Sequence, residues 1–290
     1  MKCKLCGSPD VNTIYKGPIR SGGAESGYED GFTVKECGAC GIAFLDPFPN
    51  ELRNYYETED YWRSHHGPIE IRKLQQKLGP EQLRWAYEIG TERLRDKRIA
   101  DFGCGAGLFL DLIGGIAAET IGVDLARHFQ PHLEANGHRY IQNANDLGDE
   151  SIDVAVSFDT LEHLMNPKQF LDAIFAAMVP RGIFFLGVPN QNDFLKELVP
   201  AYLPFFYHKS HLFYFSATTL INLLEEIGFQ HCTVRYVHKY DIMNLISWAR
   251  DGKGTGKKGS DLFDQFTEDA FQTNIERQGI ASHIFVEAYK

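Results

Sequence analysis

Glycines and acids are spaced for ligand binding around residues 101–124. The segment 101–107, DFGCGAG, follows a strand-like run at 98–100 and opens onto a helix-like run at 108–113. A second apolar run, 120–123, ends at Asp124. Glycine lets a backbone turn sharply and approach a ligand without a Cβ in the way, and the N-terminus of a helix offers unpaired N–H groups to an anion. These features predict the first half of a nucleotide-binding βαβ unit.

The glycine spacing distinguishes between two kinds of nucleotide ligand. The dinucleotide fingerprint is G-x-G-x-x-G, whereas positions 103–107 read G-x-G-x-G, with Asp101 ending the strand before them. An acid at that point repels a pyrophosphate and attracts an ammonium group. S-adenosylmethionine carries an ammonium group, a carboxylate, a ribose and an adenine, and Asp124 is placed to bind both ribose hydroxyls. We therefore expect this cofactor; the alternative is a glycine-rich turn that binds no ligand.

Four of the six cysteines form two repeated C-x-x-C-G pairs, namely Cys3, Cys6, Cys37 and Cys40. Two such turns supply four sulfurs and predict a closed, tetrahedral, structural zinc site. The long separation between the pairs is accommodated by a glycine-rich loop at 17–31. A redox site would need only one pair, and disulfides would need an oxidising compartment. We expect Cys104 and Cys232 to be buried apolar residues.

Composition and charge limit the classes of protein to which this chain can belong. The 290 residues include 29 basic and 39 acidic side chains, a net charge of −10, and 43% are hydrophobic. Residues 1–50 hold five basic and six acidic side chains, so neither the chain nor its cysteine-containing part has the basic excess typical of nucleic-acid binders. The sequence shows no signal peptide and no run of 18 apolar residues, so we expect a cytoplasmic protein without a membrane span.

The chain divides into three predicted regions. We expect a zinc-binding module at 1–48, a helical, aromatic connector and cap at 49–96, and an α/β, Rossmann-like domain at 97–290. That domain is predicted to contain a lid insert near 190–215 and a mobile loop near 252–260. In the connector, Gly79-Pro80 is expected to break a helix that covers 69–78, and Leu83, Tyr87 and Leu94 to share one apolar face.

Further elements are predicted from apolar runs and caps. Helices are expected at 126–136, from Pro167 to about 178, and after Ser216 through 227. Strands are expected at 139–141, 152–158, 183–188 and 283–289, with another beginning at Phe229.

The run from about 97 to 230 resembles the small-molecule branch of the class I S-adenosylmethionine-dependent methyltransferases. The resemblance rests on the glycine segment, on Asp124 and on later motifs: 161–164, Asn166-Pro167, Pro189-Asn190, 211–216 and 220–229. With its cysteine pairs, the whole chain is similar to bacterial enzymes that methylate sugars, natural products or related metabolites. This implies a seven-stranded sheet whose last strand is antiparallel.

The resemblance also assigns roles to individual residues. Asp101 and Gly103 would hold the methionine end of the cofactor, and Gly105 and Gly107 would shape the loop. Asp124 would bind the ribose. The other positions implied for the cofactor are Leu125 on the adenine, Asn143 and Ala144 at its polar edge, and the Phe158 backbone near the methionine. Many relatives carry Asp where this chain has Asn143, and the 143–147 turn is equally explained as a simple Asx turn.

Transfer to an alcohol requires removal of its proton, which histidine performs near neutral pH. The candidates are His163, His208 and His211, with Asp159 beside the first; His163 and His211 are our preferred bases. Each histidine is alternatively a buried residue whose hydrogen bonds hold a loop.

Asp159, Glu162 and His163 form a D-x-x-E-H segment similar to an acid-rich segment of quinone-pathway O-methyltransferases, which is linked there to a divalent metal. The same residues are a candidate divalent-metal site here, unless Glu162 simply braces a loop. Seven aromatic residues between 202 and 215, with Lys209 available for a phosphate, either line an acceptor pocket or form the lid's own core.

The sequence is compatible with three functions. The first is a methyltransferase for a small-molecule acceptor, on oxygen or alternatively on carbon or nitrogen, working as a monomer or homodimer. The second is an RNA methyltransferase that grips RNA through its zinc module. The third is a non-catalytic module that binds S-adenosylmethionine. The acidic charge balance argues against the second.

Overall fold

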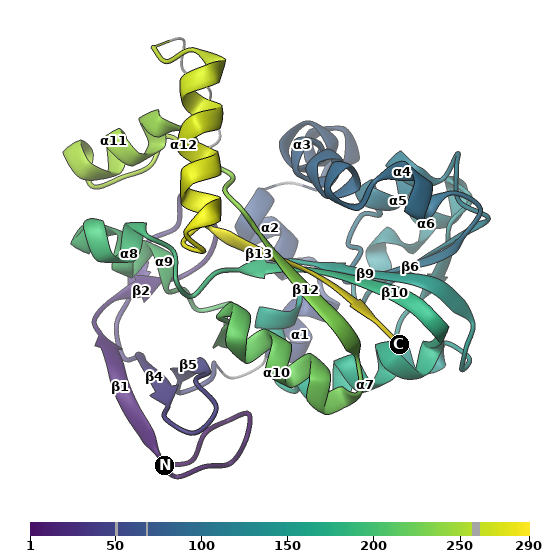
Figure 1. Cartoon of the computed structure of the whole chain (residues 1–290), viewed down its shortest axis with the longest axis horizontal. Coiled ribbons are helices and arrows are strands. Elements are labelled where there is room, and N and C mark those ends of the chain that lie inside the picture. Colours follow the sequence, from purple (N-terminus) through teal and green to yellow (C-terminus); the bar gives the residue numbers. More distant parts are fainter. Residues whose placement is uncertain (50–51, 68, 257–261) are drawn as a thin grey trace.

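A seven-stranded sheet forms the centre of the molecule (Figure 1). The computed structural model describes residues 1–49, 52–67, 69–256 and 262–290. The strand order is β12-β13-β10-β9-β6-β7-β8. These strands are β6 (Arg98–Phe102), β7 (Glu119–Val123), β8 (Arg139–Ile141), β9 (Ile152–Phe158), β10 (Met178–Pro189), β12 (Gln230–Val237) and β13 (His283–Tyr289).

The pairing of the strands matches the expected fold. Strand β13 pairs antiparallel with β10 and β12, whereas the pairs from β10 through β9, β6 and β7 to β8 are parallel. The predicted Rossmann-like sheet with an antiparallel last strand is therefore confirmed. Parallel strands of such a sheet bring their carboxyl ends to one edge, which is where ligands bind.

Helices cover both faces of the sheet (Figure 1). One apolar core joins the sheet to α7 (Pro167–Ala177) and α10 (Ala217–Ile227). A second core joins the opposite face to α3 (Ile71–Ile89) and α5 (Leu108–Ile113). The remaining helices are α1 (Leu52–Glu57), α2 (Asp60–His66), α4 (Thr91–Leu94), α6 (Gln130–Ala135), α8 (Leu195–Leu198), α9 (Leu203–Phe206), α11 (Ile242–Asp251) and α12 (Gln265–Arg277). Short 3₁₀ turns are η1 (Arg127–Phe129), η2 (Ala144–Asp146), η3 (Leu161–His163) and η4 (Pro200–Tyr202).

The N-terminal region shares a sheet with the lid. A four-stranded sheet has the order β1-β4-β5-β11, with β1 (Val11–Lys16), β4 (Thr33–Cys37), β5 (Ala43–Asp46) and β11 (Phe213–Tyr214). A separate hairpin consists of β2 (Ile19–Arg20) and β3 (Tyr28–Glu29). Because β11 belongs to the lid, hydrogen bonds cross from the zinc module into the predicted catalytic domain.

A third apolar core fills the space between the zinc module and the lid. It combines module residues such as Ile19 and Leu45 with lid residues such as Tyr202 and Tyr207, and with Trp248 from α11. Six of the seven lid aromatics are buried, and the seventh, Phe205, packs partly against this core. Of the two interpretations of the lid aromatics, packing is therefore the one that the structure supports for most of them.

The connector differs from its prediction in two ways. Helix α3 runs through Pro80 without a break. Pro80 is on the exposed side, where the carbonyl group it leaves without an N–H partner can bond to water. Leu83 and Tyr87 are 60% and 83% exposed, so the predicted apolar face is wrong except at Leu94. The face that packs on the sheet consists instead of Leu74, Trp85 and Ile89.

The later elements lie close to their predicted bounds. Helix α10 begins after a capping box formed by Ser216 and Thr219, and α7 begins at Pro167 after the Asn166 cap. The helix expected at 126–136 is a 3₁₀ turn followed by the short α6. The loop expected to be mobile at 252–260 falls partly outside the described residues. None of the described helices combines the length and apolar character needed to cross a membrane.

Candidate cofactor and acid–base site

The glycine loop between β6 and α5 has the conformation that its sequence requires. Gly103, Gly105 and Gly107 have φ values of 88°, 51° and 75°, in the region that side chains rarely adopt. A Cβ on Gly103 would lie 2.2 Å from the Thr160 hydroxyl oxygen, and one on Gly105 would lie 2.4 Å from the Trp62 ring. The loop therefore needs glycine for both backbone angle and space.

Asp124, at the end of β7, holds this loop in place. One carboxylate oxygen accepts a hydrogen bond from the Gly105 N–H at 2.7 Å, and the other accepts from the Ala126 N–H at 2.8 Å. The Tyr140 hydroxyl donates to the Asp124 carbonyl oxygen at 2.6 Å. Because each carboxylate oxygen can accept more than one bond, Asp124 keeps capacity for ligand hydroxyls.

Asp101 is a buried carboxyl group with only 5% of its surface exposed. No hydrogen bond or ion pair to its carboxylate is found within the described ranges of the chain. Burial, and secondarily the charge of Asp124, raises the pKa of Asp101 to about 8. An unpaired buried carboxylate beside a glycine loop fits the ammonium group of S-adenosylmethionine, which would pair with the charged form.

The other predicted cofactor residues follow the strands that end at the same edge. Leu125 is half-buried directly after Asp124, and Ala144 is half-buried after β8. Asn143 is exposed, and its amide nitrogen lies 3.3 Å from an Asp146 carboxylate oxygen, while the turn itself is closed by the Asp146 N–H donating to the Asn143 carbonyl at 2.9 Å. The Phe158 carbonyl accepts from the Thr160 hydroxyl at 3.1 Å. Cofactor contacts at these positions stay predictions.

Helices α1 and α2, called the cap here (52–66), lie over the loop. Trp62 reaches the loop at Gly105 and packs edge-on against Phe129, with 4.8 Å between ring centroids. Tyr61 stacks on His65 at 4.3 Å. Burial and then the charge of Glu162 raise the pKa of Tyr61, with smaller effects from other groups including Asp124. The Tyr61 phenol therefore lies close to acids on both sides of the site.

Glu162, His163 and His211 form an acid–base cluster at the carboxyl end of β9. Glu162 is 1% exposed, and neither of its carboxylate oxygens has a hydrogen-bond partner. The Nε2 atoms of His163 and His211 lie 3.9 Å and 3.8 Å from the same Glu162 oxygen, Oε1. Burial raises the pKa of Glu162 well above its usual value. The geometry fits a proton shared within the cluster, and its donor set also fits a divalent cation.

The tautomer of His163 follows from its partners. Its Nδ1 lies 2.8 Å from the Ser210 carbonyl oxygen, which can only accept, so Nδ1 carries the proton. The Tyr56 hydroxyl from the cap lies 3.1 Å from Nδ1 and also donates to the Ser210 carbonyl. The unprotonated Nε2 faces Glu162. Burial lowers the pKa of His163 to about 4, so its imidazole is neutral at pH 7.

His208 has the opposite tautomer. Its Nδ1 accepts from the Ser210 N–H at 3.3 Å, which leaves the proton on Nε2. The ring lies 3.6 Å from that of His211. Burial, followed by the neighbouring His211, lowers the pKa of His208 well below its usual value. His208 is therefore a donor beside the cluster and a poor candidate for the base.

Asp159 departs from the predicted D-x-x-E-H set. Its backbone is left-handed, with φ of 49°. Its carboxylate lies 3.3 Å from the Lys239 ammonium and 3.4 Å from His283 Nε2, and Lys239 also pairs with Glu81. The predicted metal set of Asp159, Glu162 and His163 is therefore wrong in its first member, which the turn directs into an ion-pair network. His211 takes that place in the cluster.

The four paired cysteines gather at the N-terminal end of the zinc module. The Sγ atoms of Cys3 and Cys40 are 3.8 Å apart, and those of Cys6 and Cys37 are 3.6 Å apart. A tetrahedron with zinc–sulfur bonds of about 2.3 Å has edges of about 3.8 Å. Thus the arrangement fits the predicted zinc site, with all four sulfur atoms within 4.8 Å of one another.

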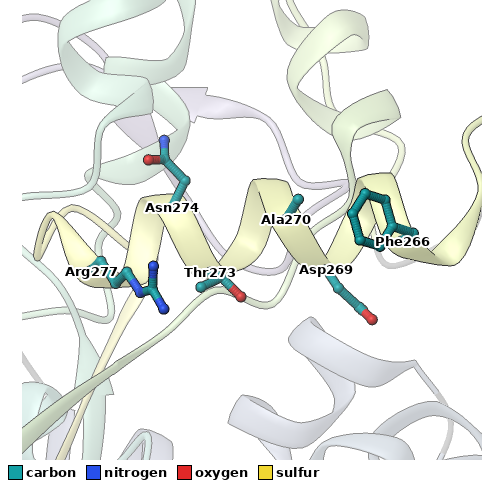
Figure 2. Close-up of a pocket in the computed structure, with 6 residues that line it drawn as sticks. All are labelled: Phe266, Asp269, Ala270, Thr273, Asn274 and Arg277. Atoms are coloured by element: carbon teal, nitrogen blue, oxygen red, sulfur yellow. The ribbon is translucent and has the colours of Figure 1, made fainter.

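A shallow hollow elsewhere on the surface contains none of the predicted residues. It has a volume of about 370 Å³ and follows one side of α12 (Figure 2). Its lining includes Phe266, which is 82% exposed, and Arg277 at the other end of the helix. No catalytic or metal-ligating arrangement accompanies it among the described residues.

The fold and the glycine-loop site together define the class of α/β proteins that bind a nucleoside-containing cofactor at a sheet edge. Residues 71–234, more than half of the chain, match the family described as "Methyltransferase domain". The chain therefore belongs to the methyltransferase-domain family, and the predicted enzyme class is confirmed at that level.

Relatives agree with this assignment. A probable S-adenosylmethionine-dependent methyltransferase of Mycolicibacterium smegmatis is 32% identical over 149 residues, 50% of this chain and 56% of that protein. The alignment thus spans only about half of either protein. A ubiquinone biosynthesis O-methyltransferase of Ruegeria pomeroyi is 25% identical over 227 residues, 69% of this chain and 88% of the relative.

Two solved structures share the fold. A SAM-dependent methyltransferase from Archaeoglobus fulgidus has a TM-score of 0.52 at 20% identity, covering 77% of this chain and all of that one. A putative methyltransferase in complex with the Haloferax volcanii Trm112 activator has a TM-score of 0.54 at 14% identity, covering 83% of this chain and 98% of the other.

Several residues of the site are not indicated by any pattern in the sequence. Ser210, Lys239 and His283 reach the site through long-range packing, and no local pattern marks them. Tyr56 and Trp62 belong to the aromatic region predicted as a connector and cap, where Tyr56 contacts His163 and Trp62 contacts the glycine loop.

The raised pKa of Asp101 predicts that cofactor affinity depends on pH. Its pKa of about 8 lies above the ordinary value of 3.8, so the cofactor-free protein binds a proton there at pH 7. Binding an ammonium group expels that proton. We expect S-adenosylmethionine affinity to fall by up to about tenfold per pH unit below 8, with proton release measurable by calorimetry in two buffers.

Asp101→Asn is the matched variant for this experiment. It should abolish tight cofactor binding. Because the wild-type carboxyl group loses its favourable proton as pH rises through about 8, the Asn variant should unfold at a higher temperature at pH 8. Cofactor affinity that is independent of pH in the wild type would contradict the assignment.

The zinc site gives a second prediction. Metal analysis of the purified chain should find one zinc ion, which Cys6→Ser removes and Cys232→Ala retains. Removing the zinc should also loosen the lid, because β5 and β11 share one sheet. Faster hydrogen exchange of the backbone amides at 212–215 would report this loosening of the lid. Unchanged protection of those amides after zinc loss would contradict a coupling between zinc site and lid.

Proposed function

We propose that this protein transfers the methyl group of S-adenosylmethionine to an oxygen atom of a small-molecule acceptor. The observation that carries the proposal is the placement of a buried, neutral imidazole pair across from the glycine loop. Thr160, which contacts the loop at Gly103, precedes His163 by one turn and accepts its backbone N–H. Cofactor-binding residues and a base candidate thus lie along one sheet edge.

The burial of the acid–base cluster supports a small acceptor. His208 is 4% exposed and His163 9% exposed, and both lie beneath the cap and lid. A macromolecular substrate would have to insert a projecting group past both segments. The net charge of −10 also gives no electrostatic attraction to RNA.

The chain's own residues supply binding, orientation and proton transfer. When bound, S-adenosylmethionine supplies an already activated methyl group. Asp101 would pair with its ammonium group, and Asp124 would accept bonds from its ribose while holding Gly105. His163 or His211 would take the acceptor's proton on Nε2. The resulting imidazolium is stabilised by Glu162, which both Nε2 atoms face.

His163 is the more strongly oriented of the two bases. The Ser210 carbonyl fixes its tautomer, in the way that a third group orients the base in other proton-transfer sites. His211 contacts His163 with 4.7 Å between the rings. We assign His163 as the base and His211 as the group that shares its proton with Glu162.

The first test is cofactor binding and turnover in the full chain. Wild type should bind S-adenosylmethionine in the micromolar range and release S-adenosylhomocysteine with hydroxylated sugars or phenols from an acceptor panel. Asp124→Ala should weaken binding by at least about tenfold, since it removes the ribose acceptor and frees the Gly105 loop. A folded wild type that binds no cofactor would overturn the proposal.

The second test separates the base from the structural alternative. His163→Asn should lower kcat by about 10²–10⁴-fold without changing the dissociation constant of S-adenosylmethionine. Because the base must be neutral and its pKa is about 4, wild-type kcat should stay flat from pH 8 to 6 and decline only toward pH 4. An unchanged kcat in His163→Asn would show that the histidine only supports the loop.

Metal analysis distinguishes proton sharing from metal binding at the cluster. We expect Glu162→Gln to keep the single zinc of the cysteine site, and activity to survive a chelator that leaves that zinc bound. A second metal equivalent that is lost in Glu162→Gln would establish a metal centre there instead.

A further inference from the structure

Arg20 is a cation of the zinc module that reaches the catalytic side of the molecule. It ends β2, and its backbone is fastened to the lid on both sides. The Arg20 N–H donates to the Tyr207 carbonyl at 3.0 Å, and the Lys209 N–H donates to the Arg20 carbonyl at 2.9 Å. The preceding residue, Ile19, is fully buried in the core shared with the lid. The position of Arg20 is therefore fixed by the fold.

The Arg20 side chain has no acidic partner within the described part of the chain. Its Nε is buried without a hydrogen bond, and its guanidinium stacks over the Phe205 ring at 4.2 Å. The nearby carboxylates are engaged elsewhere, because Glu29 pairs with Lys209 at 2.9 Å and Asp193 accepts from Tyr202 at 3.0 Å. The surroundings are otherwise phenolic, formed by Tyr28, Tyr202, Tyr214 and Tyr240.

Arg20 is half-buried, and even partial burial without a counter-ion is costly for a guanidinium group. Burial lowers the pKa of Arg20, and the four phenols only partly offset this. The guanidinium over the Phe205 ring carries a fork of N–H donors suited to two oxygens of one anion. An unpaired fork of this kind is the arrangement expected of an anion-binding residue.

Arg20 also lies close to the acid–base cluster. Its backbone forms a β-bridge with His208, and the His208 ring lies tilted against that of His211, with 3.6 Å between ring centroids. The charge of Arg20 contributes, after burial and neighbouring histidines, to the lowered pKa values of His208 and His211. An anion held by Arg20 would therefore place the rest of its molecule beside the proposed bases.

We propose that Arg20 binds an oxyanion group, a carboxylate or a phosphate, of the acceptor, so that the substrate is an anionic small molecule. This inference rests on the proposed function, since it names the substrate class of the same site. It also gives the zinc module a role in recognition, because the module delivers Arg20 through the β2–β3 hairpin.

The experiment uses the full zinc-loaded chain with two probes, inorganic phosphate and benzoate, against chloride at constant ionic strength. Binding is followed by thermal unfolding and by fluorescence, for which Trp248 is placed against Phe205 at 4.9 Å. The variants are Arg20→Met, which keeps an apolar stem over Phe205, and Arg20→Lys, which keeps the charge. Lys16→Met is the control, because it removes one positive charge from an exposed position of the same module.

We expect at least one probe to bind wild type, and its dissociation constant to rise at least tenfold in Arg20→Met, less in Arg20→Lys, and not at all in Lys16→Met. Whether phosphate or benzoate binds identifies the type of oxyanion. Without probe, Arg20→Met should unfold no earlier than wild type, since no ion pair is lost.

Equal binding in wild type and Arg20→Met, or no binding of either probe to wild type, would overturn the proposal. A clear loss of stability in Arg20→Met without probe would show a structural role instead. Calorimetry with S-adenosylmethionine runs in parallel and should give the same dissociation constant in all four proteins. Failure of the wild type to bind that cofactor would overturn the proposed function, independently of the anion result.

Discussion

The backbone of Leu212 connects the three parts of the molecule. Its N–H donates to the Glu162 carbonyl at 2.8 Å, and its carbonyl accepts from the Leu45 N–H at 2.9 Å. The next residues, β11, continue the sheet of the zinc module. Glu162 and its histidine neighbours are therefore positioned by a lid whose strand β11 belongs to the sheet of the cysteine-containing module. A zinc ion bound by the four cysteines would then act as a distant support for the geometry of the proposed active site.

Buried charge is distributed unevenly over this framework. Asp101, Asp124 and Glu162 are carboxyl groups whose pKa values are raised chiefly by burial. In contrast, Asp159 is compensated by the buried Lys239. Acids without counter-ions lie where a cationic cofactor would bind, and an arginine without a counter-ion lies where an acceptor would bind. The site is therefore organised before its ligands arrive. Folding stability is given up for this preorganisation.

Local patterns in the sequence predict the parts of the site that follow from local geometry. The G-x-G-x-G loop, Asp124 and the cysteine pairs have fixed relations to a strand, a turn or a metal, so their residue types alone indicate their neighbours. Asp159 shows the limit, because a single left-handed residue turns its carboxylate from Glu162 toward Lys239. Arg20 shows the limit of local patterns more strongly, since nothing in a glycine-rich loop indicates that one arginine will contact His208 across the fold.

The cap contacts both the glycine loop and His163, the proposed base. Trp62 from α2 occupies the space in front of Gly105, so a ligand approaching the loop from that side must displace it. Tyr56 from α1 contacts His163 and the Ser210 carbonyl that fixes its tautomer. Lifting the cap to exchange cofactor would therefore also release a constraint on His163. If His163 is the base, as proposed, its imidazole would be fully oriented only under a closed cap, and proton transfer would be restricted to the state in which methyl transfer can occur.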